Sequence, residues 1–179
     1  MDFKTDEDFV IETQKGNKEA FGVLVERYEP KLLRYGRKFL FDRNNIQDLV
    51  QDVFIATYEN IKDFNTSEKF SPWIYRIAHN TFVNGLKKTS RNPFKSLDFD
   101  TILPHIIYDD PIKKEQELEE MRKMIEEGLV HIESKYREVL ILYYLEEMKY
   151  KEISDILKIP SSTVGIRIKR AKKALKVAY

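Results

Sequence analysis

The chain has 179 residues, of which 42% are hydrophobic and 34% charged, with a formal net charge of +1. That length suits one or two small domains, and the near-neutral balance means that any affinity for nucleic acid must come from local clusters of charge. Cysteine is absent, which excludes a disulfide framework and thiolate metal sites. The sequence has no apolar run near the roughly 18 residues that span a bilayer, and its acidic N-terminus is unlike a secretory signal, so we expect a soluble intracellular protein.

The first predicted helix covers residues 17–40. Apolar side chains recur there every three or four positions, which places them on one helical face. Pro30 lies inside this run, and we expect a kink or a tight break at that point. The residues of the apolar face are Phe21, Leu24, Val25, Tyr28, Leu32, Tyr35 and Phe39.

The second predicted helix covers residues 45–61. Asn45 followed by Asp48 three residues later suits a helix start. Asp48, Gln51 and Asp52 gather on the polar side of this helix, opposite an apolar side that includes Val53. A solvated surface explains this acidic group, and so does a docking surface for a basic partner.

The third predicted helix runs from Ser71-Pro72 to about Lys88. Serine is a favourable N-cap, and proline is tolerated at the first helical position. Aromatic rings alternate here with cations and amides, which suits single-stranded nucleic acid, because bases stack on rings and phosphates meet positive charges. Core packing is the simpler interpretation for Trp73 taken alone. The candidate contacts are Lys69, Trp73, Tyr75, Arg76, Asn80, Asn84, Lys87 and Lys88.

The hydrophobic pattern changes after this helix. Residues 89–111 contain three prolines and show no sustained hydrophobic period, which is typical of a linker. Helical patterning resumes at residue 112, and the sequence shows neither an internal repeat nor a convincing strand. We therefore predict an all-α protein with two small helical domains, residues 1–90 and 112–179, joined by a flexible tether at 91–111.

The last 32 residues, 148–179, are strongly basic. They carry nine Lys and Arg against two acidic residues, a net charge of +7. Two short amphipathic segments flank the turn Lys158-Ile159-Pro160, which predicts a helix-turn-helix. The expected buried residues are Ile153, Ile156 and Leu157 before the turn, and Val164, Ile168, Ala171 and Leu175 after it. A solvated basic helix that binds nothing is the alternative.

The second helix of such a motif enters the major groove by its N-terminal residues. The hydroxyls at that end can meet phosphates or base edges, and the cations further along can follow the DNA backbone. Gly165 would let the helix lie close to DNA, since it has no side chain. The candidate contacts are Ser161, Ser162, Thr163, Gly165, Ile166, Arg167, Lys169, Arg170 and Lys173.

Three blocks in this order resemble the extracytoplasmic-function (ECF) group of bacterial RNA polymerase sigma factors. They are "DLVQDVFIATYENIKDF" (48–64), "KFSPWIYRIAHN" (69–80) and "SKYREVLILYYLEEMKYKEISDILKIPSSTVGIRIKRAKKAL" (134–175). The resemblance covers roughly residues 10–90 and 112–178. A helix-turn-helix alone would be weak support, and the specificity comes from all three blocks in one short chain.

The resemblance implies a role for each block in transcription initiation. Asp48, Gln51 and Asp52 match the surface for the β′ clamp helices of core RNA polymerase. The segment Lys69–Asn84 matches the one that opens and captures the minus-ten promoter element, with Lys87 and Lys88 following it. Pro160–Lys173 matches the helix that reads the minus-35 element, and "SKYREVLILYYL" matches the segment that meets the β flap tip.

Five positions depart from the family pattern. Asn84 stands where Asp is usual, and Gly85 where a basic or polar residue is common. Glycine inside a helix costs up to ~1 kcal/mol relative to alanine, so we expect fraying near Gly85. The other departures are Ser154 in place of Ala, Lys158 where Gly is frequent, and Gly165 in place of Lys or a polar residue.

Two other classes of function compete with this interpretation. A stand-alone helix-turn-helix regulator would have a sensor or dimerisation domain in residues 1–90 and no affinity for polymerase. An enzyme is disfavoured, because His79, His105 and His131 lack metal-ligand spacing and nucleotide-binding or nucleophile motifs are absent. We expect no cofactor, metal or small-molecule substrate. The resemblance implies a cytoplasmic protein held by an anti-sigma factor, which in this family is frequently membrane-bound.

Overall fold

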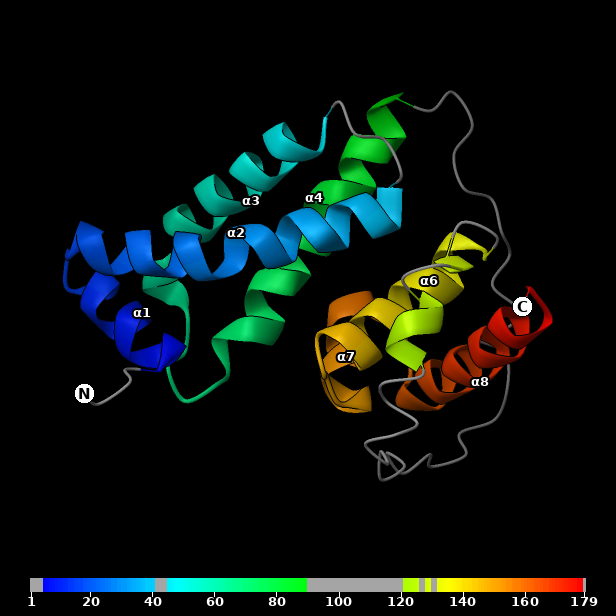
Figure 1. The fold of residues 1–179 in the computed structure, drawn as a ribbon. Helices are drawn as coiled ribbons and strands as arrows, with labels where there is room; N and C mark the ends of the chain where they lie inside the picture. Colours follow the sequence, from blue (N-terminus) through cyan, green and yellow to red (C-terminus); the bar gives the residue numbers. More distant parts are fainter. Residues whose placement is uncertain (1–4, 41–44, 90–120, 126–127, 130–131, 179) are drawn as a thin grey trace. The chain divides into compact units, whose positions relative to one another are not determined.

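The computed structural model describes residues 5–40, 45–89, 121–125, 128–129 and 132–178 (Figure 1). The chain divides into two compact units, Met1–Pro93 and Phe94–Tyr179. Regular structure in the described ranges is helical, which confirms the predicted all-α class with two helical units. The expected tether at 91–111 lies outside the described residues, and the boundaries placed at 90 and 112 stay predictions.

In its described residues the N-terminal unit contains the helices α1 (Asp6–Gln14), α2 (Lys18–Leu40), α3 (Ile46–Asn60) and α4 (Phe70–Thr89), with a 3-10 turn at Ile61–Asp63. The long helix α2 packs against each of the other three. Its buried stripe has the predicted spacing, because a residue recurs on the same face every three or four positions. The buried stripe consists of Leu24, Tyr28, Leu32 and Tyr35, and the Tyr28 and Tyr35 rings contact those of Phe70 and Phe82 on α4. The buried residues of α3 and α4 include Val50, Val53, Phe70, Ile74, Ala78 and Phe82.

Helix α1 is an element that the sequence analysis did not predict. Its hydrophobic periodicity is weak, and only Val10 and Thr13 are buried. A capping box starts it: the Asp8 N–H donates to Thr5 Oγ1 at 3.2 Å, and the Thr5 N–H donates to Asp8 Oδ2 at 2.8 Å. The spacing of Thr5 and Asp8 is the sequence signal that could have revealed this helix.

Details at Pro30, at the start of α3 and at the start of α4 differ from the sequence predictions. Helix α2 continues through Pro30 without a break, since Pro30 is exposed and one lost hydrogen bond does not outweigh the packing on either side. Asn45 is the N-cap of α3, as predicted, but its side chain makes no capping hydrogen bond. Helix α4 begins at Phe70, one residue before the predicted cap Ser71, and the Phe70 N–H donates to Glu7 Oε1 at 2.9 Å.

The C-terminal unit contains helical residues at 121–125, then α6 (Ser134–Leu140), a π-helical segment (Ile141–Leu145), α7 (Tyr150–Leu157) and α8 (Ser161–Ala178). Its core centres on "EVLILYY", in which every residue from Glu138 to Tyr144 is buried. The predicted apolar faces of α7 and α8 are buried, except that Leu157 is half-buried. No helix among the described residues combines the length and apolarity needed to cross a membrane.

Candidate nucleic-acid interface

One face of α4 carries most of the residues expected to contact single-stranded DNA. Lys69, just before the helix, and then Trp73, Arg76, Asn80 and Asn84 follow each other at intervals of three or four residues, so they line up along one side. All are exposed except Trp73, which is half-buried. We call these five residues the α4 stripe. A ring, two cations and two amides on one accessible line are suited to an unpaired strand.

Two aromatic residues of this segment have different environments. Trp73 packs against Phe64, with ring centroids 4.9 Å apart, and against Phe70, at 5.7 Å. Tyr75 has no exposed surface and packs in the core with its ring centroid 5.3 Å from that of Tyr35. The structure therefore places Tyr75 on the opposite side of α4 from the stripe, where a base cannot stack on it.

The end of α4 behaves differently from the expectation of fraying. The helix passes through Gly85 and ends at Thr89. A Cβ at Gly85 would lie 2.8 Å from Leu49 Cδ2, so the glycine allows α3 and α4 to approach closely. The side chains of Lys87 and Lys88 lie outside the described residues, and their expected contacts stay predictions.

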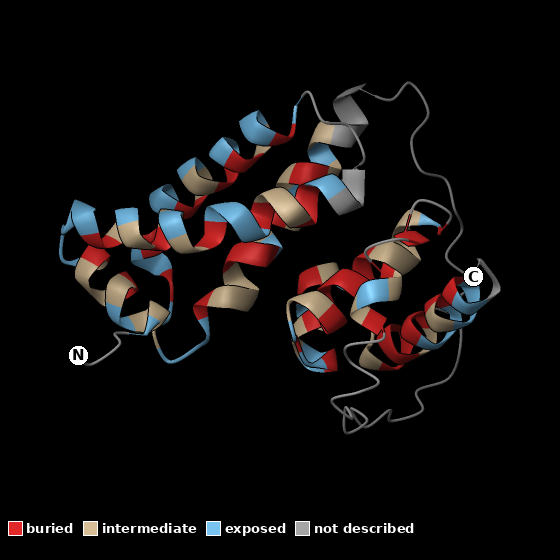
Figure 2. Cartoon of the chain, in the orientation of Figure 1, coloured by how far each residue is buried: buried red, intermediate tan, exposed pale blue. Residues whose placement is uncertain are grey.

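The acidic surface of α3 is exposed to solvent. Asp48, Gln51 and Asp52 are exposed, and Figure 2 shows exposed residues along the outer side of this helix. Ile55 and Tyr58 lie on the same side and are 57% and 43% exposed. A helical period alone does not show where the buried side of a helix ends, so the exposure of these two apolar residues was not predictable from their spacing.

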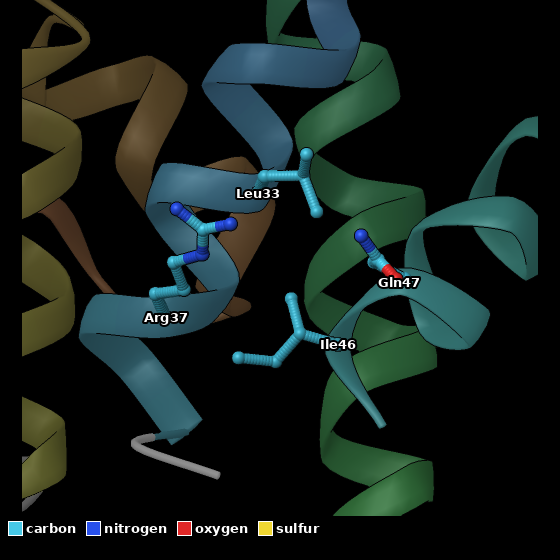
Figure 3. A pocket seen from close by; sticks show the side chains of 4 residues that line it. All are labelled: Leu33, Arg37, Ile46 and Gln47. Atoms are coloured by element: carbon cyan, nitrogen blue, oxygen red, sulfur yellow. The ribbon is translucent and has the colours of Figure 1, made fainter. Parts of the chain in front are cut away.

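A pocket of about 380 Å³ opens between the last turns of α2 and the start of α3 (Figure 3). Leu33 and Ile46 supply apolar walls, while Arg37 and Gln47 supply polar groups. Gln47 immediately precedes Asp48, so the pocket adjoins the acidic surface of α3. We assign it no ligand.

The turn between α7 and α8 contains a residue with a strained backbone and a side-chain hydrogen bond that spans the turn. Lys158 has a left-handed backbone with φ of 54°, which explains why glycine suits this position. The Ile159 N–H donates to the Ser154 carbonyl at 3.3 Å, and Ser154 Oγ donates to the Ile159 carbonyl at 2.6 Å. Ser154 therefore makes one backbone and one side-chain hydrogen bond across the turn, and an alanine at this position would lack the side-chain bond.

Helix α8 presents a basic face that is accessible. Lys169, Arg170 and Lys173 are exposed and Ile166 is half-buried, and their spacing puts them on one side of the helix. We call these four residues the α8 face. Ser161, the first residue of α8, is half-buried. Three cations on one accessible side are suited to the phosphates of a DNA backbone.

Four of the expected DNA contacts in α8 are buried in this structure. Thr163 is 2% exposed and Arg167 is 6% exposed, while Ser162 and Gly165 are also buried. Burial lowers the pKa of the Arg167 guanidinium, because it disfavours the charged form. Arg167 thus lies with the core of α8 rather than among the outward-facing cations. Polar and apolar residues alternate in this part of the sequence, and that pattern does not show which of the polar residues are buried.

The comparisons with known proteins agree with the order of these two units. Two family models match, Sigma-70 region 2 over residues 24–92 and Sigma-70 region 4 over residues 122–175. The ECF RNA polymerase sigma factor SigW of Bacillus subtilis is 31% identical over 175 residues, covering 93% of this chain and 92% of that protein. The ECF RNA polymerase sigma-E factor of Escherichia coli K12 is 32% identical over 178 residues, covering 96% and 92%.

The fold is also similar to that of solved structures. The structure of CnrH in complex with the cytosolic domain of CnrY aligns with a TM-score of 0.66 at 24% identity, covering 96% of this chain and 95% of that one. The sigma factor RpoE in complex with the anti-sigma factor NepR from Bartonella quintana aligns with a TM-score of 0.64 at 18% identity, covering 88% and 95%. At these identities the likeness concerns the fold alone.

Proposed function

This chain belongs to the extracytoplasmic-function sigma factors of bacterial RNA polymerase, and we propose how its surfaces divide the work of initiation. It is an alternative sigma factor, and promoter-specific initiation requires three contacts. The acidic surface of α3 docks on the β′ clamp helices of core polymerase. The α4 stripe captures the minus-ten strand, and the α8 face binds the minus-35 element. Residues 1–90 and 112–179 are the domains that carry these contacts, with 91–111 between them.

The assignment of α4 to the minus-ten strand is supported by one observation: the residues of the α4 stripe lie on one side of the helix and are accessible to solvent. Opening a promoter requires a surface that prefers an unpaired strand to the duplex. Bases stack on the exposed edge of Trp73, while Lys69 and Arg76 meet phosphates and Asn80 and Asn84 supply amide hydrogen bonds. Lys87 and Lys88 extend this contact. Tyr75 supports it indirectly, since its buried ring holds α4 against α2.

For the minus-35 element, the exposed residues make the direct contacts. Lys169, Arg170 and Lys173 bind phosphates and Ile166 faces the groove, with Ser161 at the helix N-terminus. The buried residues Ser162, Thr163, Gly165 and Arg167 set the position of α8 in its unit. This assignment distinguishes residues that touch DNA from residues that orient the reading helix.

Two partner proteins and a location follow from the family. Ser134, Lys135 and Tyr136, which are half-buried at the start of α6, offer the contact to the β flap tip. An anti-sigma factor competes for the same surfaces as core polymerase and holds the chain inactive, in the cytoplasm or at the membrane. The protein has no catalytic activity of its own and needs no cofactor, metal or small-molecule substrate.

The test is a core-polymerase pull-down followed by permanganate footprinting of promoter DNA. The chain should co-purify with core polymerase, and the holoenzyme should make thymines around the minus-ten element reactive. Trp73→Ala and Arg76→Ala should reduce this reactivity more than they reduce polymerase binding. Lys18→Ala, which removes an exposed cation from α2, is the matched control. A chain without polymerase affinity that still binds duplex DNA would support the stand-alone regulator instead.

A further inference from the structure

Helix α1 is anchored to α2 through the acidic residues of its first turn. Arg27 Nη1 donates to Asp6 Oδ1 at 2.6 Å, and the Tyr28 hydroxyl donates to Asp6 Oδ2 at 2.6 Å. Arg27 also lies over the Phe9 ring, with its Cζ 4.7 Å from the ring centroid. These contacts fix the position of α1 on the long central helix, so groups further along α1 can serve as fixed points.

Two further side chains of α1 hold the backbone on either side of the loop that precedes α4. Gln14 Nε2 donates to the carbonyls of Ile61 and Phe64 at 2.8 and 2.9 Å. Glu7 Oε1 accepts from the Phe70 N–H at 2.9 Å. Glu7 and Gln14 are seven residues apart, two helical turns, and therefore lie on the same side of α1. Figure 1 shows α1 beside this connection.

The two held ends belong to aromatic residues that support Trp73. The rings of Phe64 and Phe70 lie 5.9 Å apart, and both contact the Trp73 ring. Between them, residues 65–69 form a turn in which the Glu68 N–H donates to the Asn65 carbonyl at 2.9 Å. The loop ends in exposed Lys69, the first residue of the α4 stripe. Moving either end would therefore displace Trp73 or Lys69.

We propose that Glu7 and Gln14 are positioning residues for capture of the minus-ten strand, although neither belongs to the α4 stripe. This inference rests on the proposed function of the stripe. Gln14 fixes the carbonyl end of the loop, and Glu7 caps the N-terminus of α4, where a carboxylate is favourable beside the helix dipole. Together they set the distance between the Phe64–Phe70 support and the exposed edge of Trp73.

The experiment compares two affinities for each full-length variant assembled with core polymerase. One is the affinity for core polymerase, which depends on α3. The other is the affinity of the holoenzyme for a single-stranded oligonucleotide with the minus-ten sequence of a promoter that it opens. Gln14→Ala, which removes two hydrogen bonds, and Glu7→Ala, which removes one, should each weaken strand binding by roughly three- to ten-fold and leave core affinity within about two-fold. The conservative change Glu7→Gln keeps an acceptor oxygen and should recover most of the strand affinity.

Glu12→Ala is the matched control, because Glu12 lies on the same helix and pairs with Lys15 on the surface. It should change neither affinity. Strand affinity equal to that of the parent in both alanine variants would overturn the inference. So would a parallel fall of both affinities together with the melting temperature, since that would show a general loss of stability. A parent holoenzyme that opens no promoter would instead overturn the proposed function of the stripe, and this inference with it.

Discussion

Lys158 is the residue whose backbone conformation sets the bend between α7 and α8. Its φ of 54° is left-handed, a region that costs a residue with a Cβ ~1–2 kcal/mol. Glycine adopts this conformation freely but loses more entropy on folding, which offsets part of the gain. The lysine is therefore tolerated, and the hydrogen bond from Ser154 Oγ to the Ile159 carbonyl compensates for part of its backbone strain.

We predict that Lys158→Gly stabilises the C-terminal unit by up to ~1 kcal/mol. The same substitution at Lys169, inside α8, should destabilise it by ~1 kcal/mol, because glycine is a poor helix former. Urea unfolding followed by circular dichroism measures both changes. Fluorescence of Trp73, the single tryptophan, reports the N-terminal unit and should not shift. A destabilising Lys158→Gly would mean that the left-handed conformation is wrong.

Tyr28 gives the stability of the N-terminal unit a dependence on alkaline pH. Burial, followed by the hydrogen bond to Asp6, raises the pKa of Tyr28 above its usual value. The unfolded chain then loses this proton at about pH 10 while the folded chain keeps it. The stabilisation is therefore complete below about pH 10 and is lost as the pH rises towards the folded-state pKa.

We predict that Tyr28→Phe lowers the free energy of unfolding at neutral pH by about 1–2 kcal/mol. Above pH 10 the variant should lose stability less steeply than the parent, because the group that must stay protonated is gone. Tyr58→Phe removes a hydroxyl from an exposed position on α3 and serves as the control. Denaturant unfolding between pH 7 and 11, followed by Trp73 fluorescence, measures the slopes. Parallel slopes for parent and Tyr28→Phe would contradict the assignment.

At the scale of the helix, α3 offers acidic groups on one side and the core on the other. Asp48 and Asp52 lie one turn apart with Gln51 beside them, and Ile55 extends this surface with an exposed apolar side chain. Rim charges mainly influence association rates, whereas an apolar group at the centre of an interface contributes affinity. Both kinds of group are present on the outer side of α3.

We predict that the double change Asp48→Ala and Asp52→Ala slows association with core polymerase and weakens binding by about ten-fold or more. The effect should shrink as salt is added, since the charges are exposed. Glu26→Ala with Glu29→Ala removes two exposed carboxylates from α2 and is the matched control. Surface plasmon resonance across a salt series separates the rates. Equal association rates for the two double variants would remove α3 from the interface.

Helix α8 divides its charged residues between the outside and the core. Arg170 and Lys173 face outward and should each neutralise about one phosphate. We predict that Lys173→Ala or Arg170→Ala lowers the salt slope of promoter binding by roughly one unit, with similar losses on all sequences. Lys123→Ala, an exposed cation elsewhere in the same unit, should not change the slope. An unchanged slope in both α8 variants would exclude this face from DNA.

The helices themselves could be predicted from the sequence where their hydrophobic period is strong. Leu24, Tyr28, Leu32 and Tyr35 are buried as their spacing indicated. Helix α1 was missed because its stability comes from polar contacts to α2 and α4, such as Glu7 with the Phe70 N–H, which involve residues far apart in sequence. A hydrophobic period contains no information about such contacts.

The sequence indicated which segments hold the candidate sites, but it did not show which of their side chains are exposed. Lys69, Arg76 and Asn80 are accessible as the sequence suggested, whereas Tyr75 and Arg167 are buried. Tyrosine and arginine side chains are apolar along most of their length and polar at the end, so either residue is compatible with a core position and with a DNA contact. Tertiary packing decides between the two, and it places Tyr75 against Tyr35.

For the whole molecule, the contacts that we propose with polymerase and promoter DNA are divided between the two units. The N-terminal unit combines the acidic surface of α3 with the α4 stripe, and the C-terminal unit presents the α8 face. The formal charge of +1 for the chain conceals this division, because acidic and basic surfaces nearly cancel. A protein with separate polymerase, minus-ten and minus-35 contacts should confer promoter choice on a polymerase that has none.

Run-off transcription with core polymerase and genomic DNA fragments shows directly whether the chain confers promoter choice. We expect transcripts from discrete start sites that require the chain. They should disappear when Arg76→Ala is combined with Lys173→Ala, and persist with Lys18→Ala and Lys123→Ala. If core polymerase yields the same transcripts with and without the chain, the chain does not direct promoter choice.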